Sequence, residues 1–229
     1  MEAIVLAGGL GTRLRTVVAD VPKPMAPVQG RPFVSFMLDR LVDAGFERAV
    51  FAVGYRHEAL RAHFGADYRG LPLIYSVEAA PLGTGGAIRL ALQHLEGEQV
   101  FVLNGDTYVE LDFHAMRRAH ESVAATLTIA VRHVDDASRY GALELADGRV
   151  RGFAEKGRSG PGWINAGAYV LGQKLSELFP PHPAFSFEND VLARHVDSVR
   201  PAAFRVRGAF IDIGTPEDYG RAERLLPKR

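Results

Sequence analysis

The sequence predicts an α/β protein with a mixed, mainly parallel sheet and helices on both faces of that sheet. Short apolar runs alternate with amphipathic segments through the first half of the chain, and the second half is richer in strands. Such alternation is typical of parallel strands joined by right-handed crossovers, which place helices on both sides of the sheet. No Ser- or Gly-rich linker interrupts the chain, so we expect one domain over residues 1–229.

The first half supplies four expected strands and three expected helices. Apolar runs predict strands at residues 2–7, 48–54, 71–76 and 99–104. Apolar residues at three- and four-residue spacing predict helices at residues 32–45, 57–65 and 84–95. The first two helices should end at Gly45 and Gly65, since glycine commonly follows the last helical turn. In sheets of this kind, ligands bind beyond the carboxyl ends of the strands.

The second half should contain mostly strands. They are expected at residues 125–132, 141–145, 149–156, 163–171 and 202–208, with helices near residues 188–196 and 216–226. Asp147-Gly148 between two of these strands predicts a hairpin with a two-residue turn.

Composition narrows the class of protein. A chain of 229 residues with 47% hydrophobic residues can bury a sizeable core. Its formal net charge is zero, so we expect no nucleic-acid partner and no membrane partner. Cysteine is absent, which excludes disulfides, thiolate catalysis and cysteine-based metal sites. The apolar run in the opening MEAIVLAGG is too short for a signal peptide. No stretch reaches the roughly 18 apolar residues of a membrane span. We therefore expect a soluble, cytoplasmic protein.

The segment LAGGLGTRL, residues 6–14, follows the first strand and places three glycines within four positions. Glycine lets the backbone approach a ligand and point successive N–H groups at oxygen, so the segment is a candidate cradle for phosphate or base. The Walker pattern requires Gly-Lys-Ser/Thr at the end of the loop, whereas Thr12 and Arg13 follow here. A dinucleotide fingerprint requires a third glycine where Leu14 stands. For the segment alone, a tight turn with exposed arginines remains the alternative.

Two further segments carry groups suited to an anion. Lys23 lies between Pro22 and Pro24, which stiffen the chain and argue against a helix around it. A lysine fixed in this way is better suited to meeting a phosphate than a mobile surface lysine, although a solvated lysine is the alternative. Residues 83–86 begin a predicted helix, where unsatisfied N–H groups and the positive dipole end favour an anion or a polar ring edge. An ordinary N-cap at Thr84 is the alternative there.

Two aspartates follow apolar strands. Asn104-Gly105-Asp106 ends one strand, and a carboxylate at the carboxyl edge of a parallel sheet is a natural ligand for Mg²⁺. Asp212 repeats this arrangement before a helix start. Residues 215–218 are expected to cap that helix and complement its dipole, which leaves Asp212 as the candidate second metal ligand. A turn-forming aspartate is the alternative interpretation of Asp106.

Eight motifs in one order resemble the sugar-1-phosphate nucleotidylyltransferase family over almost the whole chain. In chain order they are LAGGLGTRL, VPKPM, PLGTGGA, NGD, Glu155-Lys156, INAG at residues 164–167, FSFENDVL and IDIGTP. Each motif is weak by itself, but eight in order make the match specific. The resemblance implies a Rossmann-like sheet of the nucleotide-diphospho-sugar transferase type. It also implies that residues 1–112 mainly bind nucleotide and residues 113–229 mainly bind sugar phosphate.

The resemblance implies roles by position. Nucleotide binding falls to Leu6, Ala7, Gly8, Gly9, Gly11, Thr12, Arg13, Lys23, Pro81, Gly83, Thr84, Gly85, Asn104 and Asp106. Sugar-phosphate binding falls to Gly105, Gly141, Glu155, Lys156, Asn165 and Gly167. Arg13 and Lys23 would be catalytic, and Asp106 and Asp212 would hold Mg²⁺. A solvated pair at residues 155–156, a strand-end hydrogen bonder at Asn165 and a bulge at Gly141 are the plainer alternatives.

The expected reaction joins a nucleoside triphosphate and a sugar 1-phosphate and releases pyrophosphate. Within the family, PLGTGGAI and the short chain look closest to the guanylyltransferases that use GTP and D-glycero-alpha-D-manno-heptose 1-phosphate, for bacterial surface polysaccharides such as capsule. Mannose-1-phosphate guanylyltransferases and N-acetylmuramate-1-phosphate uridylyltransferases are alternatives. Many guanylyltransferases of this group have an acid immediately before PLGT, whereas here Ala80 stands there and Glu78 lies two positions earlier.

Two further expectations follow from the resemblance. Guanine would be read by the Glu78 side chain or by backbone carbonyls, since the residue before PLGT lacks a carboxylate. Family members are often oligomeric, so a homo-oligomer is expected. A catalytically inactive regulatory protein that binds a nucleotide sugar is the alternative from a different class.

Overall fold

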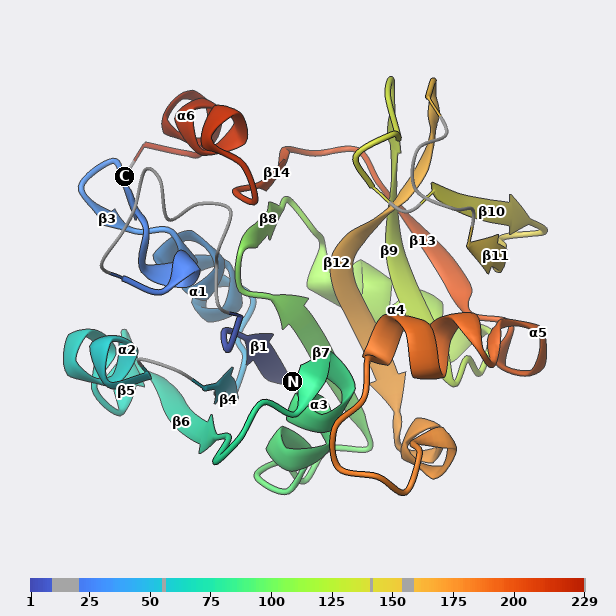
Figure 1. Cartoon of the computed structure of the whole chain (residues 1–229), viewed down its shortest axis with the longest axis horizontal. Helices are drawn as coiled ribbons and strands as arrows, with labels where there is room; N and C mark the ends of the chain where they lie inside the picture. The colour runs from blue at the N-terminus through green and yellow to red at the C-terminus, as the bar shows by residue number, and fades with distance from the viewer. Residues whose placement is uncertain (10–20, 55–56, 141, 154–158, 229) are drawn as a thin grey trace.

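The computed structural model describes residues 1–9, 21–54, 57–140, 142–153 and 159–228. Figure 1 shows a central sheet with helices packed around it. In chain order the elements are β1 (Glu2–Leu6), the 3-10 turn η1 (Lys23–Met25), β2 (Pro27–Val28), β3 (Arg31–Pro32), α1 (Val34–Asp43), β4 (Arg48–Val53), α2 (His57–Phe64), β5 (Asp67–Tyr68), β6 (Leu71–Val77), α3 (Gly83–Leu92), β7 (Gln99–Asn104), β8 (Thr107–Val109), α4 (Phe113–Ser122), β9 (Leu127–Val134), β10 (Ala142–Ala146), β11 (Arg149–Phe153), β12 (Gly162–Gly172), the 3-10 helix η2 (Gln173–Leu178), the π-helix η3 (Phe187–Ala193), α5 (Val196–Val199), β13 (Ala202–Val206), β14 (Phe210–Asp212) and α6 (Pro216–Leu225).

Ten strands form the main sheet in the order β10-β11-β13-β9-β12-β7-β1-β4-β6-β5. The strands β7, β1, β4 and β6 are parallel neighbours. The long strand β12 lies between β7 and β9 and is antiparallel to both. The sheet is mixed, as predicted, and its parallel pairs are concentrated in the first half of the chain. In the second half, β13 and β9 are parallel while the other pairs are antiparallel.

Helices cover both faces of the sheet, which confirms the prediction. Successive side chains of a strand point to opposite faces, so β1 directs Ala3 and Val5 to one side and Ile4 to the other. Ala3 and Val5 pack in one buried cluster with residues of α1, α2 and α4. Ile4 packs in a second cluster with residues of α3 and η3. Among the described residues, none of the helices has the length and hydrophobicity that crossing a membrane requires.

Turn residues end the elements where the sequence indicates. Gly45 and Gly65 follow α1 and α2 with φ angles of 70° and 62°, a region in which glycine carries no steric penalty. Asp147 and Gly148 have φ angles of 52° and 70° between the antiparallel strands β10 and β11. Two successive positive φ angles are the signature of the predicted two-residue hairpin turn.

The helix α4 was not anticipated from the sequence. Its buried residues are only Phe113, Met116 and His120, a narrow stripe on a helix that is otherwise polar. Its start is fixed by Asp112, whose side chain accepts a 2.8 Å hydrogen bond from the Ala115 N–H. The N-cap residue Asp112 was therefore a stronger sequence signal for this helix than its narrow apolar stripe.

The segment around Lys23 also differs from expectation. Pro22 and Pro24 were expected to disfavour a helix, yet residues 23–25 form one 3-10 turn in which the Met25 N–H donates to the Pro22 carbonyl at 2.8 Å. Proline is tolerated in a first helical turn, because its fixed φ suits the helix and its missing N–H is not needed there. The prolines thus shape a single turn that ends before a longer helix can form.

Candidate active site

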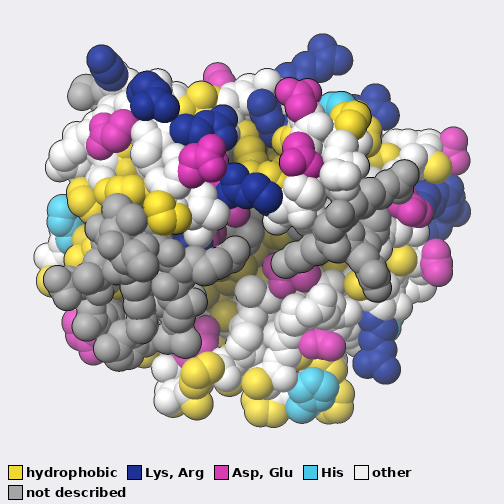
Figure 2. Space-filling view, turned by 45° about the horizontal axis from the view of Figure 1, so that its top comes forward, with side chains coloured by type: hydrophobic (Ala, Val, Ile, Leu, Met, Phe, Trp, Pro, Cys, Tyr) yellow, Lys and Arg dark blue, Asp and Glu magenta, His cyan; other side chains and the backbone are white. Residues whose placement is uncertain are grey.

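A cavity of about 370 Å³ opens where β1, β6 and β7 end. It lies beyond the carboxyl ends of the strands, where ligands were expected to bind. Figure 2 shows a hollow in the middle of one face of the molecule, with hydrophobic side chains inside it and basic and acidic side chains beside it. The cavity is lined by Leu6, Ala7, Gly8, Gly9, Lys23, Pro24, Ala52, Glu78, Pro81, Gly83, Thr84, Ala87, Asn104, Asp106 and Glu188.

The glycine-rich turn after β1 forms one wall of this cavity. A Cβ on Gly8 would lie 3.3 Å from the backbone nitrogen of Gly54 and 3.4 Å from Glu78 Oε1, so glycine lets the chain pass close to both. A Cβ on Gly9 would meet no atom of the described residues within 4 Å. The remaining predicted members of the segment, Gly11, Thr12 and Arg13, lie outside the described residues.

Lys23 reaches the cavity from the turn η1. Its Nζ donates a 2.6 Å hydrogen bond to Oδ2 of Asp106, and the two side chains form an ion pair. The Lys23 side chain is only 12% exposed, whereas the Asp106 carboxylate is 33% exposed and faces the cavity. The lysine is therefore a fixed, desolvated positive charge and not a mobile surface lysine.

Asp212 lies beside this pair. The strand β14, which ends at Asp212, pairs with β8 so that Asp212 is opposite Thr107, the residue after Asp106. Its Oδ1 accepts a 2.7 Å hydrogen bond from the Gly214 N–H. Burial raises the pKa of Asp212 above its usual range, the negative charge of Asp106 raises it further, and Lys23 opposes the shift. Two carboxylates that repel each other through space form a natural site for a cation.

The residues present fit a divalent metal ion. Within the described residue ranges, no three His, Cys, Asp or Glu side chains come together as a complete metal site. A pair of carboxylates is nevertheless the donor set that Mg²⁺ uses when substrate phosphates supply further oxygen ligands. Asp106 and Asp212 are therefore suited to a cation that is shared with a bound phosphate.

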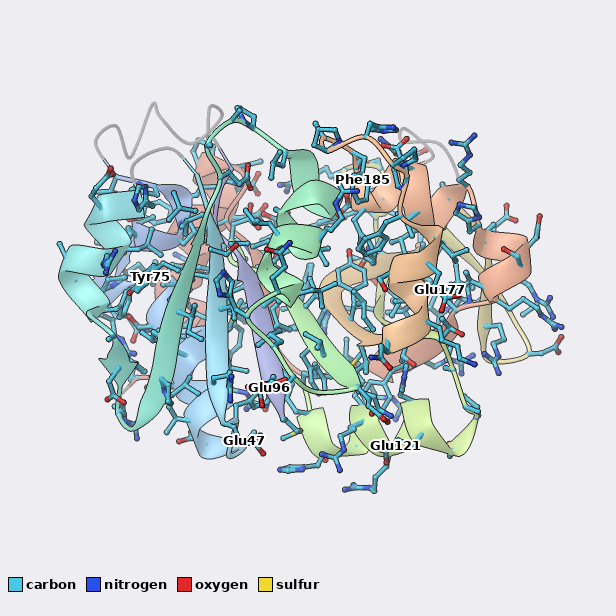
Figure 3. The ribbon with its side chains drawn as sticks, turned by 90° about the horizontal axis from the view of Figure 1, so that it is seen from below. Glu47, Tyr75, Glu96, Glu121, Glu177 and Phe185 are labelled. Atoms are coloured by element: carbon cyan, nitrogen blue, oxygen red, sulfur yellow. The ribbon has the colours of Figure 1, made fainter. Side chains whose placement is uncertain are left out.

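The start of α3 is less open to an anion than its sequence indicates. The N–H groups of Gly85 and Gly86 both point to the carbonyl oxygen of Phe185, at 2.9 and 3.4 Å. A Cβ on Gly85 would lie 2.2 Å from Cε2 of the Phe185 ring, which sits beside this end of α3 (Figure 3). Of the predicted residues in this helix, Gly83 and Thr84 line the cavity, whereas Gly85 packs against the aromatic ring and is not among the lining residues.

Thr84 does not cap α3, so the alternative interpretation of this residue is wrong. The N-cap position is Leu82, and no side chain caps the helix there. The Thr84 hydroxyl donates a 2.6 Å hydrogen bond to Glu188 Oε2 and accepts one of 2.9 Å from the Phe187 N–H. Thr84 therefore joins the start of α3 to the π-helix η3.

The predicted sugar-phosphate residues lie around the same strand ends. Asn165 donates from Nδ2 to the Tyr169 hydroxyl at 2.6 Å and accepts from the Gly167 N–H at 3.0 Å, within an irregular stretch of β12. A Cβ on Gly167 would lie 2.9 Å from the Asn104 side chain, so glycine lets β12 approach β7 here. Gly105 packs against the Leu6 carbonyl, where a Cβ would be only 2.6 Å away. Gly141, Glu155 and Lys156 lie outside the described residues.

Two carboxylates in the cavity wall were not assigned a firm role from the sequence. Glu78 accepts a 2.9 Å hydrogen bond from the Leu82 N–H, and burial raises its pKa. Glu188 lies in the motif FSFENDVL, which was used only as a family signature. The motif contains two acids, and the sequence alone does not distinguish Glu188 from Asp190, which accepts a hydrogen bond from the Ser186 N–H. Neither carboxylate belongs to the Asp106–Asp212 pair, so each is available as a hydrogen-bond acceptor for a ligand.

A lysine and a carboxylate that line a cavity at the strand ends, with a second carboxylate beside them, define the class, which is an α/β protein suited to a phosphorylated ligand beside a cation. The chain belongs to the nucleotidyl transferase family, whose model matches residues 2–229. It is 40% identical over 226 residues to D-glycero-alpha-D-manno-heptose 1-phosphate guanylyltransferase of Aneurinibacillus thermoaerophilus, covering 99% of this chain and 98% of that protein. It is 36% identical to the enzyme of the same name from Campylobacter jejuni, covering 96% and 97% of the two chains.

A solved structure resembles this chain equally well. HddC from Yersinia pseudotuberculosis, crystallised as a complex with GMP-PN, superimposes with a TM-score of 0.85 at 39% identity, covering 97% of this chain and 98% of that one. Mannose-1-phosphate guanylyltransferase of Mycobacterium tuberculosis is 33% identical, and the matched region is only 64% of that longer protein. The expected family and fold are therefore confirmed.

Proposed function

We propose that this protein transfers GMP from GTP to D-glycero-alpha-D-manno-heptose 1-phosphate and releases pyrophosphate. The observation that carries the proposal is the convergence of Lys23, Asp106 and Asp212 at the carboxyl ends of the strands. The choice of substrates is supported by full-length similarity to two enzymes named for that reaction.

The reaction is an in-line displacement at the alpha phosphorus. An oxygen of the sugar 1-phosphate attacks, the bond to the beta phosphate breaks, and pyrophosphate leaves with its electron pair. A phosphate monoester is already a competent nucleophile near neutral pH, so the site needs no general base. Lys23 places a desolvated positive charge beside the cavity, where it stabilises negative charge that develops on the phosphate oxygens.

The proposal includes Mg²⁺ held by Asp106 and Asp212. When bound, the metal ion polarises phosphate oxygens and offsets the repulsion between two anionic substrates. Before it binds, Lys23 partly neutralises Asp106 through their ion pair. We propose Arg13 and Lys156 as further positive charges for the triphosphate and the sugar phosphate, as the motifs imply.

We propose Glu78 as the group that reads guanine. Its carboxylate lines the cavity beside Gly8. A half-buried carboxylate accepts hydrogen bonds from neighbouring N–H groups, and guanine presents two of these, at N1 and at the 2-amino group. Uracil and thymine present a single N–H, so an acceptor pair built for guanine would be left incompletely satisfied.

The test is a matrix of pyrophosphate-release assays. GTP, UTP, dTTP, ATP and CTP are each combined with heptose, mannose, glucose and N-acetylmuramate 1-phosphates. We expect the highest kcat/KM for GTP with the heptose 1-phosphate, with GTP exceeding UTP and dTTP by at least about tenfold. A preference for UTP or dTTP would contradict the guanylyltransferase assignment while leaving the nucleotidyltransferase assignment intact.

A catalytically inactive regulatory protein is the competing function. A binding module has no need for a desolvated lysine paired to one of two neighbouring carboxylates, because these groups act on charge that changes during reaction. Absence of pyrophosphate release in all twenty combinations, with binding of GTP retained, would favour that alternative. We further propose that the enzyme acts in the cytoplasm, in surface-polysaccharide synthesis, as a homo-oligomer.

A further inference from the structure

A buried aspartate in the C-terminal helix holds two arginines that come from different parts of the fold. Asp218 lies in the first turn of α6, and its side chain is 2% exposed. Oδ2 of Asp218 accepts hydrogen bonds from the Arg139 guanidinium and, at 3.0 Å, from the Thr215 hydroxyl. Oδ1 accepts a 3.0 Å hydrogen bond from Arg221, one turn further along the same helix. Oδ2 therefore binds the distant Arg139 as well as the nearby Thr215, and Oδ1 binds Arg221 of the same helix.

Helix capping alone does not account for Asp218. Acids at residues 217 and 218 were expected to complement the dipole of α6, and the Asp218 N–H does donate to the N-cap Thr215 at 3.3 Å. A dipole partner can remain in water, however, whereas this carboxylate is buried. A buried charge is costly unless it is paired. The buried Asp218 carboxylate therefore favours the position of Arg139 in which the two side chains form their ion pair.

Arg139 belongs to the segment between β9 and β10, which is itself fixed to the start of β12. Asp136 accepts hydrogen bonds from the Ser138 N–H at 3.0 Å and from the Gly160 N–H at 3.4 Å. The Ala137 N–H donates to the Gly160 carbonyl at 2.9 Å. Residues 136 and 137 are therefore hydrogen-bonded to Gly160, two residues before β12, the strand that carries Asn165.

The same segment touches the strand of the second metal-site aspartate. The ring of Tyr140 packs edge to face on Phe210, with ring centroids 6.0 Å apart. Phe210 begins β14, which ends two residues later at Asp212. Arg139 and Tyr140 thus attach residues 135–140 to both sides of Asp212, at α6 and at β14.

Helix α6 also holds the segment that carries Lys23. Ala222 and Leu226 pack in one buried cluster with Ala26, Val28, Phe33 and Phe36. The Gln29 N–H donates to Glu223 at 2.9 Å, and the Tyr219 hydroxyl donates to the Pro27 carbonyl. Helix α6 therefore contacts both the Lys23 segment and residues 135–140. Its contact with residues 135–140 is the Arg139–Asp218 ion pair.

We propose that Arg139 is a positioning residue, whose ion pair with Asp218 sets the sugar-phosphate side of the cavity relative to Lys23 and the two metal-site aspartates. The inference rests on the proposed function. Reactions of this kind depend on holding the nucleophile in line with the phosphorus, and a displacement of about 1 Å can lower the rate by about 100-fold. Arg139 acts through Asp218 and does not itself contact the substrates.

The chain supplies a matched control, because Arg221 binds the same carboxylate but belongs to α6 alone. Arg139→Ala and Arg221→Ala each remove one ion pair from Asp218 and leave the other, so the buried charge stays paired in both variants. Only Arg139→Ala removes the direct link between residues 135–140 and α6. Arg139→Lys keeps a charge that can reach Asp218 but loses the guanidinium geometry that also meets Thr215 at 3.0 Å.

The experiment measures kcat, the KM for GTP and the KM for the sugar 1-phosphate in the wild type and the three variants, with melting temperatures alongside. We expect Arg139→Ala to lower kcat/KM for the sugar 1-phosphate by about tenfold or more, with the KM for GTP within about twofold of wild type. Arg221→Ala should match wild type in all three constants, and Arg139→Lys should recover part of the loss. Equal kinetics for the two alanine variants would overturn the inference, as would a lower melting temperature with unchanged kinetics in Arg139→Ala.

If Arg139→Ala does not fold, the comparison of Arg139→Lys with Arg221→Lys decides in the same way, since both keep the charges that neutralise Asp218. A lack of turnover in the wild type would contradict the proposed function itself. That outcome is distinct from wild-type turnover with no difference between the Arg139 and Arg221 variants, which contradicts only the positioning role.

Discussion

The hydroxyl of Thr84 donates a 2.6 Å hydrogen bond to Oε2 of Glu188, a residue 104 positions further along the chain. The same hydroxyl accepts a hydrogen bond from the Phe187 N–H, so it acts as both donor and acceptor. The first turn of α3 and the π-helix η3 are thereby joined at the cavity, and the Glu188 carboxylate is held in the cavity wall. Burial raises the pKa of Tyr169, the partner of Asn165, and the negative charge of Glu188 raises it further.

This relationship predicts that Glu188 accepts a hydrogen bond from a sugar hydroxyl. Glu188→Ala should raise the KM for the sugar 1-phosphate by about tenfold, the loss expected for one hydrogen bond to a charged group, with little change in the KM for GTP. Thr84→Val, which removes the hydroxyl that orients the carboxylate, should produce a smaller change in the same direction. Steady-state kinetics with each substrate varied in turn provide the measurement. An unchanged sugar KM in both variants would rule out this role.

A second prediction concerns the metal site. Asp106→Asn and Asp212→Asn should each reduce kcat by several hundredfold and weaken the response to Mg²⁺, because a lost metal-bound charge removes several kcal/mol of transition-state stabilisation. Activity is measured over a Mg²⁺ titration, with circular dichroism to verify the fold. Asp147→Asn is a suitable control, since that carboxylate is 84% exposed in a hairpin turn that asparagine also favours. Near-normal turnover in both site variants would refute the metal assignment.

Base choice gives a third prediction. Inosine triphosphate differs from GTP only in lacking the 2-amino group, so it removes one donor that Glu78 is proposed to accept. Wild-type enzyme should favour GTP over inosine triphosphate by about tenfold or more in kcat/KM, and Glu78→Gln should reduce this ratio towards one. If the ratio is the same in the variant, guanine is read by backbone carbonyls instead.

A fourth prediction concerns stability and pH. His120 is 2% exposed, its Nδ1 lies 2.8 Å from the Thr128 hydroxyl, and burial lowers its pKa below the usual value. The unfolded chain therefore binds a proton at His120 more readily than the native protein does. Stability should fall as the pH drops through the unfolded value of about 6.5, by at most about 1.4 kcal/mol per pH unit for this one group.

Urea unfolding at several pH values between 5 and 8 tests this prediction. His120→Asn keeps a hydrogen-bonding side chain near Thr128 but does not titrate in that range. The variant should be less stable at pH 7.5 because of lost packing, yet its stability should decline less between pH 7 and pH 5.5. An identical decline in both proteins would mean that other groups cause it.

Regular elements and the strand edge that carries the site were predictable from the sequence. The runs that form β1, β4 and β7 are apolar because both faces of these strands are covered, and such a pattern can be recognised without knowing their partners. Asp106 could be assigned to the site because it follows a strand of the parallel sheet, whereas Lys23, which lies in η1, was assigned from its flanking prolines and the family resemblance. Their direct ion pair is a finding of the structure.

The contacts that depend on distant partners could not be predicted. Gly85 was assigned to the nucleotide because it lies in a glycine-rich helix start, but the ring of Phe185 occupies the space beside it. Asp218 was expected to complement a helix dipole, and nothing near it in the sequence indicates Arg139. Local patterns describe what a residue does for its own helix or strand, whereas these roles are set by segments about 80 to 100 residues away.

The antiparallel strand β12 has a consequence for the order in which the chain can fold during synthesis. β7 pairs with β1 on one side and with β12 on the other, and β12 ends at residue 172. Until the ribosome has made these residues, the nascent chain carries β7 as an apolar edge with unpaired N–H and carbonyl groups, which invites association with other chains. We therefore expect a fragment of residues 1–112 to aggregate when expressed alone. The two halves bind different substrates in our proposal, but the first half depends on the second to complete its sheet.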